Sequence, residues 1–426
     1  MEKFLKFKAH LLEQLKNFKA PVIIHHYDTD GISAGAIMGK YLRDLGKEPE
    51  FISMNGLNRF NIDKIKDIPE KIILDFGTNI VEQLGESIII DHHYPRVNNI
   101  HRNLLNSFFV DMNGDRGISA SGLTSLVTDM REATALLGAV GDRQFPFVEH
   151  NRELLNRAIS NNQIIKKRDL KIYGKYSRPL FVMLGYLFED FAEDRKQAIN
   201  FIRSLGIRLK DNEKWRYYKN LDDRERHILI RAVIEKAARL GKLEEAYGDV
   251  YILRNMVEID INELTSIINA TGRKNRADIG REIALGNRDY LDIGVEILRS
   301  YQSKLRDAII YAKNNIDRRE GYMYVDGRDR IDPSILGVVL SIINEFKDYN
   351  TIVGISKEEN GILKVSIRSN EINVGSLIDR VISENRDWEG GGHEGAGGFT
   401  IPEDSLDRLI AEIDKNIKIF KHNTIP

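Results

Sequence analysis

The fold of this protein can be predicted from PVIIHHYDTDG, residues 21–31. The first half, PVIIHH (21–26), is short, apolar and rich in Val and Ile, as expected of a buried strand. Polar residues follow it directly, and residues 31–45 then show a helical pattern. A buried strand that leads through polar residues into a helix is typical of a parallel sheet with both faces covered.

Three further apolar runs have the same strand character: KIILD (71–75), SIIID (87–91) and SFFVD (107–111). Each run ends in an acidic residue, and another helical pattern follows at 120–140. Ligands of parallel α/β sheets bind beyond the carboxyl ends of the strands. We therefore expect the polar residues at these ends to form the functional site.

The rest of the chain divides into two parts. Residues from about 150 to 240 are mainly helical in pattern, as in RERHILIRAVIEKAARLG (224–241). Strand patterns return in GYMYVDG (321–327), TIVGIS (351–356) and ILKVSIRS (362–369), with a hairpin turn at EENG (358–361) and helices at 334–346 and 405–420. The prediction is an α/β domain over 1–150, a helical connector or insert over 151–318, and a smaller α/β domain over 319–426.

The composition sets limits on partners and location. The 426 residues include 63 basic and 64 acidic side chains, so the net charge is −1. Any polyanion must therefore be held by a local groove or by bound metal, and composition alone slightly favours no nucleic-acid binding. There is no cysteine for disulfides or thiolate chemistry, and no apolar run long enough to span a membrane. The charged N-terminus predicts an amphipathic helix instead of a signal peptide, and we expect a cytoplasmic protein.

The first candidate motif is HHYDTDG (25–31). His26, Asp28 and Asp30 alternate, so in an extended segment they project to one side. One imidazole and two carboxylates suit a divalent metal. We expect Gly31 to permit a tight turn into the helix. The alternative is a solvated turn in which an Asp caps the helix.

The next two motifs are LDFGTN (74–79) and IIIDHHYP (88–95). Asp75 ends a strand, where an Asp is also a common turn former. Adjacent histidines point to different sides, so one of His92 and His93 can bind metal while the other faces substrate. Asp91 can orient the ligand histidine from behind. The alternative is a pair of surface histidines.

The fourth motif is LLGAVGDRQ (136–144), where Asp142 follows a run of small residues. Gly138 and Gly141 permit close approach of the backbone, although a plain helix end with a glycine cap also fits.

The fifth motif is EGGGHEGAGGF (389–399). Gly391 and Gly392 expose N–H groups that can cradle phosphate oxygens, and His393 adds a donor. A flexible linker is the alternative reading.

Taken in order, HYDTDG, LD, DHH and GD resemble the DHH phosphoesterase superfamily, and GGGHEGAGGF resembles its DHH-associated C-terminal domain. The match looks closest to archaeal RecJ-like exonucleases, including the GINS-associated nuclease. NELTSIINATGR (262–273) also resembles a segment of those proteins. The motifs span residues 25–399.

The resemblance implies a Rossmann-like DHH domain and a smaller C-terminal domain that face each other across a cleft. It implies two divalent metal ions, usually manganese, with magnesium as the second choice. One ion is held by His26, Asp28 and Asp75, and the other by Asp30, Asp75, His92 and Asp142. His93, Arg368 and His393 contact the phosphate, with DRGISASG (115–122) near the substrate.

The activity implied is exonuclease cleavage of single-stranded DNA or RNA from an end, in DNA replication, repair or RNA turnover. GINS and other replisome proteins are the implied partners. Gly397 and Thr29 stand where the family usually has alanine, which are mild departures. Bacterial RecJ carries a further OB-fold domain for which the sequence has no counterpart. Its processivity and its 5′→3′ polarity are therefore not carried over.

Three other interpretations were weighed. A replisome scaffold without catalysis would need lost metal ligands, and no predicted ligand is missing. A phosphatase or oligoribonuclease for short substrates suits the near-zero net charge, whereas the long helical insert favours a larger nuclease. A metal-free dinucleotide-binding protein would need a glycine-rich fingerprint after the first strand, where HHYDTDG stands instead.

Overall fold

The computed structural model describes residues 2–57, 61–97, 101–256, 259–344, 350–358, 361–392 and 394–422. The chain forms two compact units, residues 1–298 and 299–426, and the boundary between them falls inside α13 (Leu291–Asn314). None of the described helices is long and apolar enough to cross a membrane.

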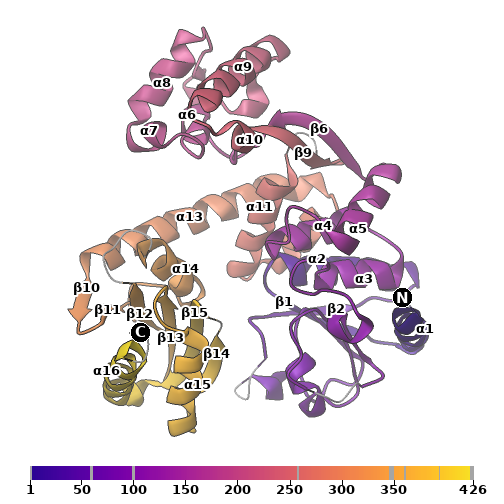
Figure 1. Ribbon diagram of the computed structural model, residues 1–426. Helices are drawn as coiled ribbons and strands as arrows, with labels where there is room; N and C mark the ends of the chain where they lie inside the picture. Colours follow the sequence, from indigo (N-terminus) through magenta and orange to yellow (C-terminus); the bar gives the residue numbers. More distant parts are fainter. Residues whose placement is uncertain are drawn as a thin grey trace. The chain divides into compact units, whose positions relative to one another are not determined.

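The first unit is built on a five-stranded parallel sheet with the order β2-β1-β3-β4-β5. Its strands are β1 (Val22–His26), β2 (Glu50–Met54), β3 (Lys71–Leu74), β4 (Ser87–Asp91) and β5 (Leu104–Asn106). The helices around it are α1 (Glu2–Asn17), α2 (Thr29–Asp44), α3 (Ala120–Thr128), α4 (Glu132–Gly141) and α5 (Glu149–Ser160), drawn in indigo to purple in Figure 1. The predicted parallel α/β domain is confirmed.

Both faces of this sheet are covered, as its apolar strands require. Ile23 faces α2, where Gly39 leaves room for it and for Phe51. The next residue, Ile24, points to the opposite face and packs with Ile73 and Ile89. Short turns at 62–65 and 81–84 close that second face. Burial on two sides explains the near-continuous apolar character of β3 and β4.

Two details of this sheet differ from the sequence prediction. SFFVD (107–111) is not a strand: residues Ser107–Val110 form a 3₁₀ turn, and the strand is β5, just before it. The Asn106 side chain accepts a hydrogen bond from the Phe108 N–H at 3.0 Å, and Asp111 ends the turn with φ 60°. This local side-chain bond replaces the sheet ladder. Strand β2 was also missed, because EFISM is only half apolar.

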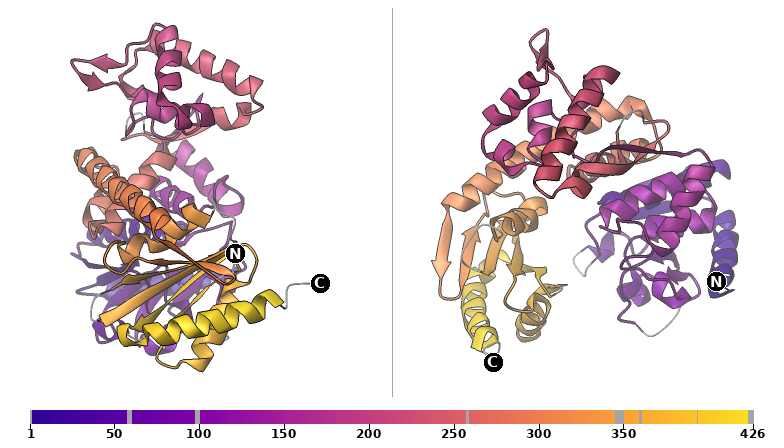
Figure 2. Two further views of the ribbon diagram at one scale, coloured as in Figure 1. Left: turned by 90° about the vertical axis from the view of Figure 1, so that its left-hand side faces the viewer. Right: turned by 45° about the horizontal axis from the view of Figure 1, so that its top comes forward.

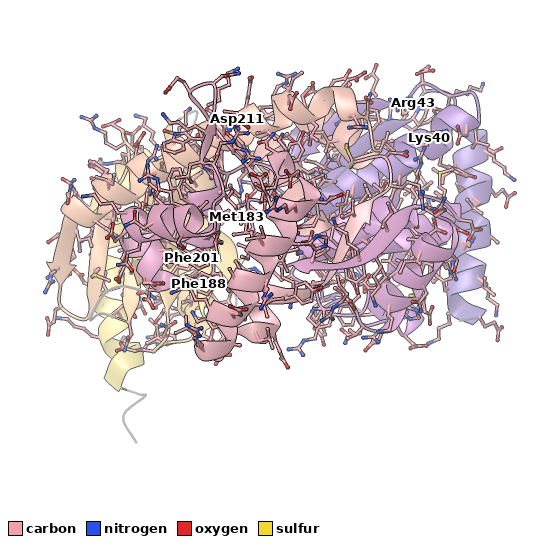
Figure 3. All side chains as sticks on the ribbon, turned by 90° about the horizontal axis from the view of Figure 1, so that it is seen from above. Lys40, Arg43, Met183, Phe188, Phe201 and Asp211 are labelled. Carbon is pink, nitrogen blue, oxygen red and sulfur yellow. The ribbon has the colours of Figure 1, made fainter. Side chains whose placement is uncertain are left out.

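A helical module extends from the first unit on a two-stranded antiparallel ribbon of β6 (Ile164–Leu170) and β9 (Tyr247–Leu253) (Figure 1). Its helices are α6 (Leu180–Leu184), α7 (Glu189–Glu193), α8 (Arg195–Ser204), α9 (Asp223–Arg239) and α10 (Leu243–Ala246), with a small hairpin of β7 (Lys210–Asp211) and β8 (Lys214–Trp215). Its core includes Met183 and Phe188, against which Phe201 packs (Figure 3). The expected helical insert is confirmed, although the ribbon was not predicted.

After the ribbon, α11 (Ile261–Arg273) and α12 (Ala277–Ala284) return to the parallel-sheet part of the first unit. Helix α11 lies against the start of α2 so closely that a Cβ on Gly272 would come within 1.6 Å of the Tyr27 carbonyl oxygen. The Thr29 hydroxyl donates to the Thr265 carbonyl oxygen at 3.1 Å. The segment 262–273 therefore buttresses the loop that carries the first motif.

The second unit is built on a six-stranded mixed sheet with the order β10-β11-β12-β13-β15-β14. Figure 2 draws this unit in orange to yellow. Its strands are β10 (Ile316–Arg319), β11 (Tyr322–Asp326), β12 (Thr351–Lys357), β13 (Ile362–Ser369), β14 (Glu389–Gly392) and β15 (Ala396–Pro402). Helices α13 and α14 (Pro333–Asn344) pack on one face, and α15 (Val374–Glu384) and α16 (Leu406–His422) on the other.

The second α/β domain and its strands at 321–327, 351–356 and 362–369 are therefore confirmed, and β10 was missed. The glycine-rich segment is not a flexible linker, because β14 and β15 pair as antiparallel strands. The predicted turn at 358–361 includes residues 359 and 360, which lie outside the described residues.

Candidate metal centre

Six predicted side chains meet at the carboxyl edge of the parallel sheet. His26 ends β1, Asp75 follows β3 and His92 follows β4. The others are Asp28 and Asp30 at the start of α2 and Asp142 at the end of α4. Possible ligand atoms lie within 4.8 Å of one another in three groups. Two of them are the sets that the family resemblance implied: His26, Asp28 and Asp75, and Asp30, Asp75, His92 and Asp142. The third group is Asp75, His92 and His93.

The first group centres on one nitrogen of His26. Its Nδ1 lies 2.8 Å from Asp28 Oδ2 and 3.3 Å from Asp75 Oδ2. Asp28 is also the N-cap of α2, because its Oδ1 accepts a hydrogen bond from the Gly31 N–H at 3.1 Å. One oxygen of Asp28 therefore caps the helix, as the alternative interpretation of this motif predicted, and the other oxygen faces His26.

The second group centres on Nε2 of His92, which lies 2.9 Å from Asp142, 3.4 Å from Asp75 and 3.9 Å from Asp30. The opposite ring nitrogen, Nδ1, donates to the Gly114 carbonyl oxygen at 2.8 Å. A neutral imidazole bonded in this way carries its lone pair on Nε2. That lone pair points at three carboxylates, an arrangement that is favourable only with a proton or a cation between them.

Asp30 is fixed by the start of α3. It is fully buried and accepts hydrogen bonds from the N–H groups of Ala120 at 2.7 Å and Ser121 at 3.0 Å, and from the Ser121 hydroxyl. The Ser121 hydroxyl oxygen also lies 2.9 Å from the Ala135 carbonyl oxygen, so its single proton can be donated to either acceptor. The sequence placed 115–122 near substrate, and its contact with Asp30 was not foreseen.

Asp75 is the residue shared by the two groups. It is 1 % exposed, and neither of its carboxylate oxygens forms a hydrogen bond with the described residues. Its backbone has φ 73°, in the left-handed region that Asp tolerates better than most residues. The left-handed turn ends β3 and brings one carboxylate within reach of both histidines.

Glycines around the centre allow its close packing. A Cβ on Gly138 would lie 2.1 Å from both Asp30 Oδ1 and the Ser121 hydroxyl, and one on Gly141 would lie 2.8 Å from Thr29 Cβ. The predicted close approach at these two glycines is confirmed. Gly31 has a different role from the one predicted, since it lies inside α2 instead of in a turn. A Cβ there would meet the His26 carbonyl oxygen at 2.4 Å.

The pKa values reflect an excess of negative charge. Burial raises the pKa of Asp30 well above its usual value, and Asp142 and Asp75 raise it further. Burial also raises the pKa of Asp142, more than His92 lowers it. For His92, burial lowers the pKa, but Asp142 and Asp75 outweigh it and hold the pKa well above the usual value. The four neighbouring carboxylates therefore repel one another, and bound protons or cations would stabilise the cluster.

The residues fit a divalent metal. His26 Nδ1, His92 Nε2 and both Asp75 oxygens are buried and form no hydrogen bond with the described residues. Donor atoms that converge without hydrogen bonding to one another are arranged as ligands around a cation. Imidazole nitrogens and carboxylate oxygens suit manganese, and the carboxylates also suit magnesium.

His93 lies at the edge of this centre. Its Nδ1 lies 2.8 Å from Asp91 Oδ1, which also accepts from the backbone N–H groups of His92 and His93. Burial lowers the pKa of His93, but Asp91 outweighs it and raises the pKa to about 9. Asp91 therefore orients His93, and the Gly114 carbonyl orients His92. The sequence predicted that Asp91 orients a ligand histidine; in the structure its side-chain contact is with the His93 ring and not with the His92 ring.

The remaining predicted residues belong to the second unit. Arg368 in β13 is half-buried, donating from Nη1 to the carbonyl oxygens of Ile367 and Gly397 and from Nε to the Ser341 hydroxyl. Gly391 and Gly392 lie in β14. His393 lies outside the described residues.

Comparison with known proteins identifies two domains. Residues 320–419 match the family model of the DHHA1 domain, and residues 172–248 match that of the DHH-CID domain. An uncharacterized protein of Methanocaldococcus jannaschii is 27% identical over 423 residues, covering 93% of this chain and 92% of its own length.

Two solved structures share the fold. The exonuclease RecJ bound to manganese aligns with a TM-score of 0.58 and 15% identity, covering 97% of this chain and 94% of RecJ. CDC45 from Entamoeba histolytica aligns with a TM-score of 0.67 and 13% identity, covering 98% of this chain and 99% of CDC45. The chain therefore contains segments that match the DHHA1 and DHH-CID domains, and it shares its fold with RecJ and CDC45.

Proposed function

We propose that this chain, with its DHH phosphoesterase fold, is a metal-dependent exonuclease that cuts single-stranded DNA or RNA from an end. The observation that carries the proposal is the shared position of Asp75 between two groups of ligand atoms. One carboxylate that belongs to two groups is the arrangement expected for a pair of metal ions. The fold of manganese-bound RecJ supports the same reading.

In this proposal His26, Asp28 and Asp75 hold one ion, and Asp30, Asp75, His92 and Asp142 hold the other. Manganese is the expected metal, and magnesium is the second choice. Two divalent cations bound there supply the positive charge that stabilises phosphoryl transfer. The protein contributes orientation: Gly114 fixes the His92 ring, and the start of α3 fixes Asp30.

His93 is proposed to bind the phosphate beside the reacting group. The Nδ1–H group of His93 donates a hydrogen bond to Asp91, and the His93 side chain is 55% exposed, so Nε2 is available to donate to a phosphate oxygen. The ring centre lies 4.6 Å from that of His92, which places it next to the metal ligands. A positively charged donor in this position neutralises charge that develops on the phosphoryl oxygens.

The C-terminal unit is proposed to bind the nucleic acid through Arg368, Gly391, Gly392 and His393. Two nitrogens of Arg368 donate hydrogen bonds to neutral partners within its own unit, and no carboxylate pairs with it among the described residues. A guanidinium without an anionic partner is suited to a phosphate. We retain residues 1–150, 151–318 and 319–426 as the proposed domains.

Two other functions have specific support. The net charge of −1 suits a phosphoesterase for short oligonucleotides, which needs no long basic groove. The fold of CDC45 suggests a scaffold role in a replisome, for example through GINS. The complete set of candidate ligands favours catalysis over a scaffold role alone.

The test is digestion of single-stranded DNA and of matched RNA, each labelled at the 5′ or the 3′ end and supplied in a series of lengths. We expect stepwise shortening with manganese and none with chelator. Preference for the shortest strands would assign the small-substrate function. No cleavage above the chelator control at any length would contradict catalysis and leave copurification with a GINS subunit as the test of a scaffold.

A further inference from the structure

A cavity lies at the base of the β6–β9 ribbon. Its volume is about 130 Å³, and it is lined by residues 131, 133–134, 162–163, 253–255 and 284–286; we call it the junction cavity. A space of this size holds on the order of four waters, enough for one small oxyanion. Residues 162–163 lead into β6, and 253–255 end β9 and follow it. The cavity therefore joins the ribbon to α4 and to the end of α12.

The charges around the junction cavity are of one sign. Arg131 and Arg254 line it, no carboxylate does, and neither arginine forms an ion pair within the described parts of the chain. The nearest acid in sequence, Glu132, does not line the cavity, but its oxygens accept hydrogen bonds from the side-chain amides of Asn161 and of Gln163, which does line it. Two arginines that line one concave site without a carboxylate in its wall favour an anion there.

The backbone gives the cavity a defined shape. Arg131, Asn162 and Gly286 have φ values of 60°, 59° and 88°, all in the left-handed region. Gln163 ties two walls together, since its side-chain oxygen accepts from the Ala133 N–H at 3.1 Å and its carbonyl from the Arg254 N–H at 2.9 Å. The side-chain amides of Asn162 and Asn255 add neutral donors.

A neighbouring cavity shows that two lining arginines do not by themselves indicate an anion site. It is lined by Arg43 and Arg281 but also by Asp278 and Glu282. Arg281 stacks on Phe51, with 3.9 Å from its Cζ to the ring centre, and its Nη1 lies 3.1 Å from His25 Nε2. These contacts give Arg281 a structural role that requires no bound anion. Arg43, at the end of α2 in Figure 3, is an exposed arginine suited to serve as a control.

We propose that the junction cavity binds a phosphate group through Arg131 and Arg254, as a site separate from the metal centre. It lies at the first turn of α4, whose far end carries Asp142, so about 15 Å of helix separates the two sites. The group is either free phosphate or a backbone phosphate of bound nucleic acid. The proposal does not depend on nuclease activity, because phosphate binding can be measured without turnover.

The first arm titrates the full-length protein with inorganic phosphate in chelator, monitored by calorimetry. Without metal, the carboxylates of the metal centre repel phosphate. Binding at the junction cavity is distinguished from binding at Arg368 because only the former is lost in the Arg131→Gln/Arg254→Gln variant. We expect one site, weakened about tenfold by Arg254→Gln and lost in the Arg131→Gln/Arg254→Gln variant. Arg43→Gln should bind as wild type. Because Arg254 is exposed, its single variant keeps the test valid if the Arg131 change impairs folding.

The second arm distinguishes the source of the phosphate. Binding of labelled oligothymidylate is followed by anisotropy at several salt concentrations. If the site holds nucleic acid, the slope of log affinity against log salt should fall by about one for each arginine removed. Loss of phosphate uptake with an unchanged slope would assign free phosphate. No uptake by wild type together with equal slopes, or equal weakening by Arg43→Gln, would overturn the proposal.

Discussion

Asp75 lies between His26 and His92: its Oδ2 is 3.3 Å from His26 Nδ1 and its Oδ1 is 3.4 Å from His92 Nε2. Both oxygens are buried, and neither has a hydrogen bond within the described residues. A buried carboxylate without donors would be costly to retain unless cations satisfy it. This geometry makes Asp75 the residue on which both metal sites depend.

Replacement of Asp75 by Asn should remove both proposed metal sites while preserving the left-handed backbone, which Asn also tolerates. We expect manganese binding to fall from two ions to at most one weak ion, and hydrolysis to fall on the order of a thousandfold or more. Calorimetric titration with manganese and end-labelled digestion measure the two effects.

The matched control is Asp111→Asn. Asp111 has a similar left-handed backbone, with φ 60°, but its side chain is exposed and pairs with Lys3 at 2.9 Å. The control should bind two ions and retain activity. Two tightly bound manganese ions in the Asp75→Asn protein would refute the shared-ligand assignment.

Ser121→Ala tests whether the start of α3 positions Asp30. The change removes the hydroxyl that donates to Asp30 and leaves the backbone donors in place. Loss of such a supporting contact typically lowers metal affinity 10- to 100-fold. We expect a decrease in manganese affinity within about that range, measured by calorimetry.

Ser125→Ala in the same helix is the control. Ser125 is also buried, and its hydroxyl also donates to a carbonyl oxygen, that of Met130 at 2.7 Å. Because Ser125 does not contact Asp30, manganese affinity should stay at the wild-type value. Equal losses in the two variants would mean that the Ser121 effect is general destabilisation of α3.

Gly138→Ala should destabilise the protein, whereas the same substitution in an ordinary exposed helix stabilises it. In a solvent-exposed helix, Gly to Ala stabilises by up to about 1 kcal/mol. Here the new Cβ would lie 2.1 Å from Asp30 Oδ1 and from the Ser121 hydroxyl. We expect a loss of about 1–3 kcal/mol in unfolding free energy together with weaker manganese binding, measured by denaturation and calorimetry. A stabilised variant with normal manganese affinity would contradict the packing described here.

Much of the candidate site could be predicted because its ligands stand where strands or helices end. Asp75, His92 and Asp142 each follow an apolar run, and parallel strands bring such ends to one edge. The two sets themselves came from the family resemblance, and the structure now places their atoms together. Their role as metal ligands remains a prediction.

The supporting contacts could not be read from the sequence, because they join distant segments. Gly114 orients His92 from 22 residues away, and Ser121 holds Asp30 from 91 residues away. No local periodicity encodes such pairs. The strand predicted at 107–111 failed for a local reason, since a single side-chain bond from Asn106 competes with the ladder.

The last prediction concerns a buried ionic cluster between the helical module and α11. Lys175 is 2 % exposed, and its Nζ lies 3.1 Å from Asp260, the N-cap of α11, and 3.8 Å from Asp169. Asp169 also accepts a hydrogen bond from the Tyr218 hydroxyl at 2.5 Å. Lys175→Met would leave the buried carboxylate of Asp260 without its cation, while Asp169 would keep Lys167 at 3.2 Å, at a cost of up to about 3–5 kcal/mol.

The readout is fluorescence of Trp215 during denaturation. Trp215 and Trp388 are the two tryptophans of the chain, and Trp215 lies in the helical module, so a Trp388→Phe background isolates its signal. We expect Lys175→Met to lower the unfolding midpoint of this signal at pH 7. Lys171→Met, at an exposed lysine four residues earlier, should leave it unchanged.

The dependence on pH follows from Asp169. Burial raises its pKa, but Lys175 and Tyr218 outweigh burial and hold the pKa below its usual value. A carboxylate with a lowered folded-state pKa stabilises the protein above its unfolded pKa of about 3.9, and this stabilisation is lost as pH falls toward the folded value. The difference in unfolding free energy between wild type and Lys175→Met should therefore be largest at pH 6–7 and should decrease below about pH 4. A constant difference across this range would show that Lys175 acts through packing instead of charge.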